Sequence, residues 1–382
     1  MKWERKTINE VCNVGDGAHA SIKRTTEGFQ YLTSKNFKLD GLDLNKVDFI
    51  SEVDYFKHFR DDSKAITKPK SNDVLLSIIG SLGAPYLVKE EDVFGLSSSV
   101  SILRPKNEII EPRFLFYWIK SNEFQSSINN IKSGVAQSFL SLGMIKSLPV
   151  IYPKELPTQR KIASILSAYD DLIENNLKRI KLLEEKASLM YKLMQKELSD
   201  VEKINLYDFA NIQMGFAFKA EAFNVEGEGI PIIRIRDIPA QMTKSHTTQE
   251  VDNQYWVEKG DLLIGMDGEF HMNEWLGQRG YLVQRVCRLR AKNELYQSYL
   301  WQALKEPIHY YETTISGATV AHLGKKHLEE IFIASPKDSM KNELEEMNVM
   351  RKLKIVLAEQ NTKLREARDI LLPKLMNGQI EV

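Results

Sequence analysis

The sequence contains two copies of one unit, each about half of its 382 residues. The match is clearest between residues 133–153 and 316–336, where Ser133, Gly134, Leu140 and Pro153 recur at a constant offset as Ser316, Gly317, Leu323 and Pro336. Two further matches occur in the same order along both copies. Upstream, Asp73–Leu76 resembles Asp261–Ile264, and downstream, Lys192–Met194 matches Lys374–Met376. Repeats of this length exclude a solenoid, whose period is much shorter. The alternative is a chance similarity between glycine-containing hairpins.

Each copy has a globular part followed by a long helix. Short apolar runs at residues 74–79 and 229–235 lie between turn signals and predict strands. Aromatic-rich segments at 112–122 and 295–305 predict helices. The predicted fold class is α+β, with two pseudo-symmetric mixed α/β domains joined by two long antiparallel helices. The predicted boundaries are 1–155 for the first domain, 156–200 for the first long helix, 201–336 for the second domain, and 337–382 for the second helix and C-terminal tail.

Both long helices show apolar residues stepping by three and four, which is typical of a coiled-coil seam. The first begins near Leu156 and contains neither Gly nor Pro from Lys161 to Lys203. Its predicted seam is Ile162, Leu166, Tyr169, Ile173, Asn176, Ile180 and Leu183. The second predicted seam is Leu353, Leu357, Gln360, Leu364 and Leu371, and Pro373 is expected to break or end that helix.

An apolar stripe exposed to water is unstable alone, so each helix needs a partner. The simplest partner for one helix is the other. Antiparallel packing would place the two domains at opposite ends of a rod of roughly 60 Å, at about 1.5 Å per residue. One polar residue lies mid-seam in each helix, Asn176 and Gln360. A buried polar residue fixes register, so the two either meet or are each solvated at a seam edge.

Composition limits the classes of protein that this chain can belong to. Lys and Arg number 52, as do Asp and Glu, which argues against coating nucleic acid by charge alone but allows a basic face. No run of eighteen apolar residues is present, so no membrane span is predicted. The first six residues lack an apolar signal core, and the two cysteines, Cys12 and Cys287, lie far apart. These features predict a reduced, cytoplasmic location.

Motifs for catalysis are missing from the sequence. It contains no GxGxxG after a strand, no GxxxxGK[ST], no Cys-x-x-Cys and no Asn-Pro-Pro-Tyr-type run for amino-methylation. Carboxylate pairs such as Asp170-Asp171 are typical of solvated faces, and Gly265–Gly268 of a turn between strands. We therefore predict no catalytic residue and no metal site in this chain.

Two similar domains at a fixed separation suit a DNA duplex, whose accessible major grooves repeat about every 34–36 Å. Arg and Lys read guanine or hold phosphates, and Gln reads adenine. For each single residue the alternative is a solvated surface side chain. The candidates in the first domain are Lys23, Ser34, Lys35, Lys68, Ser133, Gly134 and Gln137. Those in the second are Gln213, Arg234, Arg236, Lys244, Arg279, Ser316, Gly317, Thr319, His322 and Lys325.

Several segments, in order along the whole chain, resemble the DNA-specificity subunits of type I restriction–modification systems. Those in the first half are Gly80–Gly83, Gly95–Ser99, Leu103–Lys106, Ser133-Gly134 and Leu156–Ile162. Those in the second half are Gly265–Phe270, Gln284–Arg290, Ser316–Thr319 and Leu371–Ile380. One departure is that the second helix, from Lys341, lacks the Leu-Pro-x-x-Gln beginning of the first.

The resemblance implies that each domain is a target recognition domain reading one half of a split, asymmetric DNA site. It implies that the helices set the spacer and carry two modification subunits, and that restriction subunits can join. The modification partners would bind S-adenosylmethionine and methylate adenine, and the restriction partner would use ATP and Mg. This chain would bind no cofactor and would have no active site of its own.

Two other functions stay open from the residues alone. A stand-alone DNA methyltransferase or nuclease would bind S-adenosylmethionine or cut DNA without partners, although 382 residues leave little room for a catalytic domain. A protein-binding coiled-coil scaffold would have no affinity for duplex DNA, whereas a DNA reader shows a steep salt dependence.

The duplication predicts that the two domains act independently. Replacing residues 201–336 with the same segment of a relative should change one half-site and preserve the other half and the spacer, because contributions from well-separated positions add approximately. Mapping methylated adenines before and after the exchange measures this. A change in both halves at once would contradict independent domains.

Overall fold

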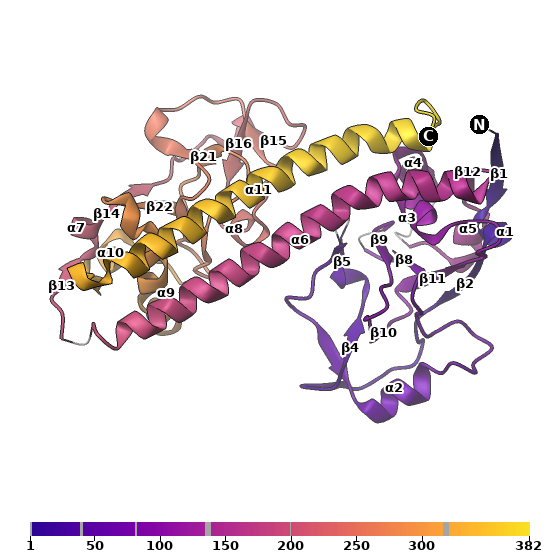
Figure 1. Ribbon diagram of the computed structural model, residues 1–382, viewed down its shortest axis with the longest axis horizontal. Helices are drawn as coiled ribbons and strands as arrows, with labels where there is room; N and C mark the ends of the chain where they lie inside the picture. The colour runs from indigo at the N-terminus through magenta and orange to yellow at the C-terminus, as the bar shows by residue number, and fades with distance from the viewer. Residues whose placement is uncertain (1, 39–40, 81, 134–138, 199, 316–320) are drawn as a thin grey trace. The chain divides into compact units, whose positions relative to one another are not determined.

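The computed structural model describes residues 2–38, 41–80, 82–133, 139–198, 200–315 and 321–382. The chain divides into two units, one of residues 1–171 with 364–382 and one of residues 172–363. Each unit contains a mixed domain and parts of both long helices, α6 (Leu156–Gln195) and α11 (Lys341–Met376) (Figure 1). The predicted fold class is therefore confirmed, with two mixed domains joined by two long helices.

The first domain precedes α6 and is built mostly from short strands. Its strands are β1 (Trp3–Thr7), β2 (Cys12–Asp16), β3 (Arg24–Thr25), β4 (Phe29–Leu32), β5 (Phe37–Lys38), β6 (Gly41–Leu42), β7 (Asp48–Ile50), β8 (Val74–Ser77), β9 (Pro85–Leu87), β10 (Phe94–Leu96), β11 (Val100–Pro105) and β12 (Pro149–Pro153). Its helices are α1 (Ile8–Val11), α2 (Glu52–His58), α3 (Pro112–Lys120), α4 (Asn122–Ser133) and α5 (Leu142–Ser147).

The second domain lies between α6 and α11 in sequence. Its strands are β13 (Lys203–Asn205), β14 (Ala210–Met214), β15 (Phe223–Asn224), β16 (Ile230–Ile233), β17 (His246–Thr247), β18 (Trp256–Val257), β19 (Leu262–Gly265), β20 (Met272–Glu274), β21 (Gly280–Leu282), β22 (Val286–Ala291) and β23 (Phe332–Ala334). Its helices are α7 (Leu206–Phe209), α8 (Asp237–Ala240), α9 (Gln297–Thr314) and α10 (Lys325–Glu329).

The two domains share one strand order, which identifies the sequence repeat as a structural repeat. A four-stranded sheet runs β2-β11-β8-β9 in the first domain and β14-β22-β19-β20 in the second. In each domain the first and last strands pair as a separate two-stranded sheet, β1-β12 or β13-β23. The parallel pair β4–β10 corresponds to β16–β21 in a second sheet of each domain.

The inner strands β8 and β19 are buried along their whole length, and their sequences are apolar without alternation, as expected for strands covered on both faces. In β8, Val74 and Leu76 join the cluster that includes α3, whereas Leu75 joins the cluster beneath the second sheet. In β19, Leu263 likewise points away from Leu262 and Ile264. Each domain is thus layered as helices, first sheet and second sheet.

Within each unit the two long helices pack side by side and antiparallel (Figure 1). In residues 172–363, Lys186 pairs with Glu346 at 2.5 Å and Asn176 donates to Asn361 at 2.9 Å. In the other unit, Arg368 pairs with Asp170 at 2.5 Å. Residue numbers fall along one helix as they rise along the other, which is the pattern of an antiparallel pair.

The predicted seam residues of α6 lie on its protected face. Ile162, Leu166, Ile173, Asn176 and Ile180 are buried. Two further members, Tyr169 and Leu183, are half-buried.

On α11 the buried stripe differs from the prediction. Leu357 is buried, and Leu364 and Leu371 are half-buried, but Leu353 and Gln360 are exposed. The stripe passes instead through Arg351, Lys354, Asn361 and Arg368. Counting apolar residues shifted the predicted register because three of these side chains carry charge. Asn176 and Gln360 do meet, since the Asn176 side chain donates to the Gln360 side chain at 3.5 Å. The shorter bond of Asn176, at 2.9 Å, is to the buried Asn361.

The second helix also continues past Pro373, where the sequence predicted a break or an end. It continues to Met376, and the amide of Asn377 then donates to the Pro373 carbonyl. Proline removes one amide donor from the helix, and only one further turn follows it.

The charges buried on α11 are paired with carboxylates. In residues 172–363, Glu274 of β20 lies 2.6 Å from Arg351 and 2.8 Å from Lys354, and Glu184 of α6 lies 3.2 Å from Lys354. The ammonium group of Lys354 also lies over the Trp301 ring, at 4.4 Å. These contacts fix the second domain to both helices.

An analogous contact fixes the first domain to the helices. Asp170 of α6 accepts from the Tyr117 hydroxyl of α3 at 2.7 Å and from Arg368 of α11 at 2.5 Å. Burial, and then the Asp170 carboxylate, raise the pKa of Tyr117. A tyrosine is already protonated at neutral pH, and the raised pKa extends the range in which this hydroxyl donates to Asp170.

The corrected stripe predicts different effects for two leucines of α11. Leu357→Asp should lower the free energy of unfolding by at least about 3 kcal/mol, because it removes buried apolar area and buries a charge. Leu353→Asp, whose side chain is exposed, should cost less than about 1 kcal/mol. Urea unfolding followed by circular dichroism measures both. Equal losses would show that the stripe is misassigned.

The buried ion cluster gives a second prediction. Glu274→Ala should cost about 3–5 kcal/mol, because it leaves two buried cations short of a carboxylate. Glu345→Ala, which removes an exposed partner of Lys341, is the matched control and should cost about 0.5 kcal/mol or less. The same unfolding measurement applies, and a small loss for Glu274→Ala would mean that the cluster does not hold this domain.

Candidate nucleic-acid interface

A turn after β8 in the first domain brings three chain segments together. The Ile78 amide donates to the Ser99 carbonyl at 3.0 Å, and the Leu140 amide donates to the Ile78 carbonyl at 2.9 Å. Ile79 forms an antiparallel bridge with Phe139. These backbone contacts hold Ile79, Ser99 and Phe139 next to one another. We call this hydrogen-bonded arrangement of three segments the frame.

The turn after β19 in the second domain repeats this frame. The Met266 amide donates to the Arg285 carbonyl at 2.9 Å, and the Leu323 amide donates to the Met266 carbonyl at 2.8 Å. Asp267 bridges His322 as Ile79 bridges Phe139. We call these six residues the frame positions: Ile79, Ser99 and Phe139 in the first domain, and Asp267, Arg285 and His322 in the second.

Each turn also depends on a glycine at the same place. Gly80 and Gly268 both have φ of +72°, in the left-handed region that favours glycine. Nothing lies within 4 Å of the space that a Cβ of Gly268 would fill, so backbone conformation alone accounts for glycine there.

A basic residue occupies a second shared position, just after β4 and β16. The Thr33 amide donates to the Asn36 side chain at 3.0 Å, and the Arg234 amide donates to Asp237 at 2.9 Å. This shared cap aligns Lys35 with Arg236, and both side chains are exposed. The two domains thus place a cation at the same point of the same turn.

Three predicted cations of the second domain, Arg234, Arg236 and Lys244, lie at one end of its second sheet, whereas Arg279 precedes β21 at the opposite end. Arg234 donates to Ser245, which follows Lys244, and Gln278, which precedes Arg279, donates to the Thr243 carbonyl at 3.3 Å. Burial, and then the nearby positive charge of Arg236, lower the pKa of Arg234. The segments that carry Arg234, Arg236 and Lys244 are therefore neighbours.

This basic group adjoins the frame positions of the second domain. A Cβ on Gly265 would lie 2.7 Å from the Ile235 side chain, so β19 and the segment between Arg234 and Arg236 are in direct contact. Asp267 follows two residues after Gly265. One region of the second domain therefore carries both the basic turn and the frame positions.

Comparison with known proteins agrees with this duplicated architecture. The family model for the type I restriction modification DNA specificity domain matches residues 1–185 and again residues 198–344. The chain belongs to this specificity family. The resemblance predicted from the sequence is thereby confirmed.

Individual relatives show the same relationship. The specificity subunit of the Escherichia coli type I restriction enzyme EcoBI is 33% identical over 135 residues, which are 35% of this chain and 28% of that subunit. A putative specificity subunit of the type I enzyme MjaX from Methanocaldococcus jannaschii is 22% identical over 100% of this chain and 94% of its own length. The crystal structure of a type I restriction–modification S subunit from M. genitalium covers 98% of this chain and 96% of its own, with 17% identity and a TM-score of 0.54. It shares the fold.

Several cations predicted for this specificity protein are held by carboxylates of their own domain. Lys68 lies 2.6 Å from Asp61, and Lys325 lies 3.5 Å from Glu329. Arg279 lies 2.6 Å from Glu258 and stacks over the Trp256 ring at 3.9 Å. DNA phosphates would have to compete with these carboxylates, so these cations are weaker candidates than the exposed Lys35 and Arg236.

The other predicted residues are scattered. Lys23 is exposed ahead of β3, and Ser34 is buried, with its amide donating to the Ser99 hydroxyl at 2.9 Å. The Gln213 side chain donates to the neighbouring Met214 carbonyl on β14. The remaining predicted residues lie outside the described residues: the side chain of Ser133, and Gly134, Gln137, Ser316, Gly317 and Thr319.

Sequence reasoning for base contacts considered polar and basic side chains, so it omitted Ile79, Phe139 and Asp267. The repeat itself carried the missing signal. Phe139 aligns with the predicted His322 at the same offset of 183 residues that relates Ser133 to Ser316. Ile79 and Asp267 are instead related by the offset of 188 residues that relates Asp73–Leu76 to Asp261–Ile264.

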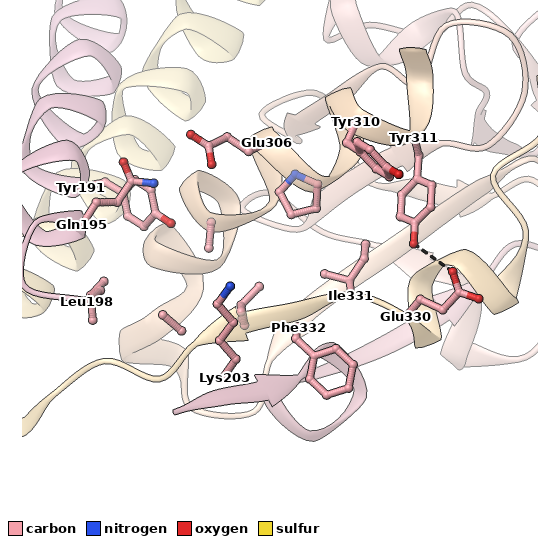
Figure 2. A pocket seen from close by; sticks show the side chains of 14 residues that line it. Tyr191, Gln195, Leu198, Lys203, Glu306, Tyr310, Tyr311, Glu330, Ile331 and Phe332 are labelled. Carbon is pink, nitrogen blue, oxygen red and sulfur yellow. Dashed lines mark hydrogen bonds between the residues drawn. The ribbon is translucent and has the colours of Figure 1, made fainter. Parts of the chain in front are cut away.

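A groove of about 600 Å³ in residues 172–363 has a different chemistry (Figure 2). Its lining includes Tyr191, Tyr310, Glu306 and Glu330, and the Tyr311 hydroxyl donates to Glu330 at 3.2 Å. Lys203 is the one basic side chain among the described residues of this lining, against the two carboxylates. The excess of negative charge disfavours phosphates, so we leave this groove out of the candidate interface.

The described part of the chain has neither a cluster of metal ligands nor a membrane-spanning helix. Among those residues, no group of three or more His, Cys, Asp or Glu side chains is placed to hold a metal ion. Within the same residues, no helix is long and apolar enough to cross a bilayer.

Proposed function

We propose that this chain reads a bipartite, asymmetric DNA site, with one domain on each half, for a type I restriction–modification complex. The observation that carries the proposal is the frame that occurs once in each domain, with an exposed cation at the same turn. A reader with two similar domains needs such a repeat, because each domain meets an equivalent stretch of duplex. The long helices would then set the spacer between the half-sites.

Lys35 and Arg236 are suited to phosphate contacts. Such contacts fix the register of a protein on the duplex and carry no sequence information themselves. A cation kept at the same turn in two domains that read different sequences fits that role. Releasing counterions from the phosphates then makes binding salt-dependent.

We further propose that modification subunits dock on the long helices, as the resemblance implies. Large apolar side chains of α6 face away from its buried stripe and are exposed. Those within residues 172–363 are Leu172, Leu177, Leu182, Leu189 and Leu193. Exposed apolar surface of this kind is typical of a protein interface.

Under this proposal the chemistry belongs to the partners. Methylation would take place on modification subunits that bind S-adenosylmethionine, and ATP-driven cleavage on restriction subunits with Mg. This chain would supply the choice of sequence, in the cytoplasm. Binding of S-adenosylmethionine by the purified chain would instead favour a stand-alone methyltransferase. Calorimetry tests this binding.

The proposed phosphate contacts predict a uniform loss of affinity. In the complex with co-expressed modification subunits, Arg236→Ala and Lys35→Ala should each weaken binding to all duplexes alike. Each should also reduce the slope of log K against log salt by about 1. Fluorescence anisotropy across a salt series measures both quantities.

Lys292→Ala is the matched control, because it removes an exposed cation at the end of β22 that lies away from Arg285. It should leave affinity and slope unchanged if Lys35 and Arg236 make the phosphate contacts. An unchanged slope for both Arg236→Ala and Lys35→Ala would contradict the assignment of these residues. A wild-type complex without salt-dependent affinity for duplex DNA would refute the proposed function.

A further inference from the structure

We infer that the frame positions read base pairs, and that the two domains read chemically different base pairs with them. The inference rests on the proposed function and names residues that set its specificity. It predicts a guanine contact for the second domain and a thymine contact for the first.

The first argument is the contrast between shared and divergent side chains on one backbone. At the basic turn both domains keep a cation, Lys35 or Arg236. At the frame positions the backbone hydrogen bonds are the same, but every side chain changes class. The matched pairs are Ile79 with Asp267, Ser99 with Arg285, and Phe139 with His322. Contacts that position a protein on DNA are independent of sequence, whereas contacts that specify must differ between unlike half-sites.

The second argument is accessibility. Ile79 and Phe139 are 46% and 40% exposed, although both are large and apolar and are paired across a bridge. In the second domain the side chains of Arg285 and His322 are about half exposed. Residues that only maintained the turn would not need large side chains directed to solvent.

The third argument concerns the groups presented by the second domain. Asp267 lies 3.2 Å from the Arg285 guanidinium and 2.6 Å from His322 Nδ1, so one carboxylate holds both side chains. Arginine presents paired donors that match the O6 and N7 acceptors of guanine in the major groove. Asp267 is a positioning residue in this arrangement, because it orients the two donors without needing to touch a base.

The first domain presents the opposite chemistry. Ile79 and Phe139 offer no donor or acceptor, and apolar side chains in the major groove contact the thymine methyl group. The hydroxyl of Ser99 is already engaged, since it lies 2.5 Å from the Ser97 hydroxyl and accepts from the Ser34 amide at 2.9 Å. The frame of this domain therefore favours an A·T pair.

The test uses the complex of this chain with its co-expressed modification subunits. Binding to a duplex library with both half-sites randomised, together with methylation mapping, gives the preference at every position. Arg285→Ala should reduce the preference for guanine at one position of one half-site by about tenfold or more, with the other half-site and the spacer unchanged. The triple change Asp267→Ile, Arg285→Ser and His322→Phe should replace that preference with one for A·T.

Ile79→Asp tests the first domain and should reduce a thymine preference in the other half-site only. Lys292→Ala is again the control and should leave both half-sites unchanged. Thermal melting should show that each variant remains folded, because the changed side chains are exposed, apart from the half-buried Asp267.

The inference is overturned if Arg285→Ala weakens binding equally to all sequences, as loss of a phosphate contact would. It is also overturned if the folded triple variant keeps the wild-type preference. Both results leave the proposed function intact when the wild-type complex is sequence-specific. A wild-type complex without sequence preference would instead refute the proposed function.

Discussion

The burial of charged and polar side chains on α11 is the interaction on which both units depend. Arg351 and Lys354 meet Glu274 of the second domain, and Arg368 meets Asp170 beside Tyr117 of the first. A buried charge without a partner is strongly destabilising. Each domain is therefore fixed on the helices by the specific carboxylate or hydroxyl that it supplies, as well as by apolar area.

Polar contacts between α6 and α11 fix the register of the two helices. An apolar stripe alone tolerates a shift by one heptad, whereas the bond from Asn176 to Asn361 has one best alignment. The Asn361 side chain also donates to the Ile173 carbonyl at 3.4 Å. In the proposed function the spacing of the half-sites depends on these helices, so a fixed register would give a fixed spacer.

The duplicated frame shows how one fold can serve two sequences. The backbone hydrogen bonds and the left-handed Gly80 and Gly268 are the same in both domains, although the side-chain contacts around them differ. The side chains at the frame positions are therefore free to diverge. Loops carried on a rigid scaffold are a common place for binding residues for this reason.

The sequence by itself determined the repeat, the mixed domains and the long helices, because motif order, apolar runs and heptad stepping are local signals. It predicted the buried stripe of α6 well, since that stripe is almost wholly apolar. On α11 it placed Leu353 and Gln360 in the seam, because hydrophobicity cannot show that Arg351, Lys354 and Arg368 are buried. Their burial depends on carboxylates distant in sequence, such as Glu274. Only the tertiary structure likewise joined Ile79 to Phe139 and Asp267 to His322, because those pairs are set by sheet topology rather than by sequence neighbours.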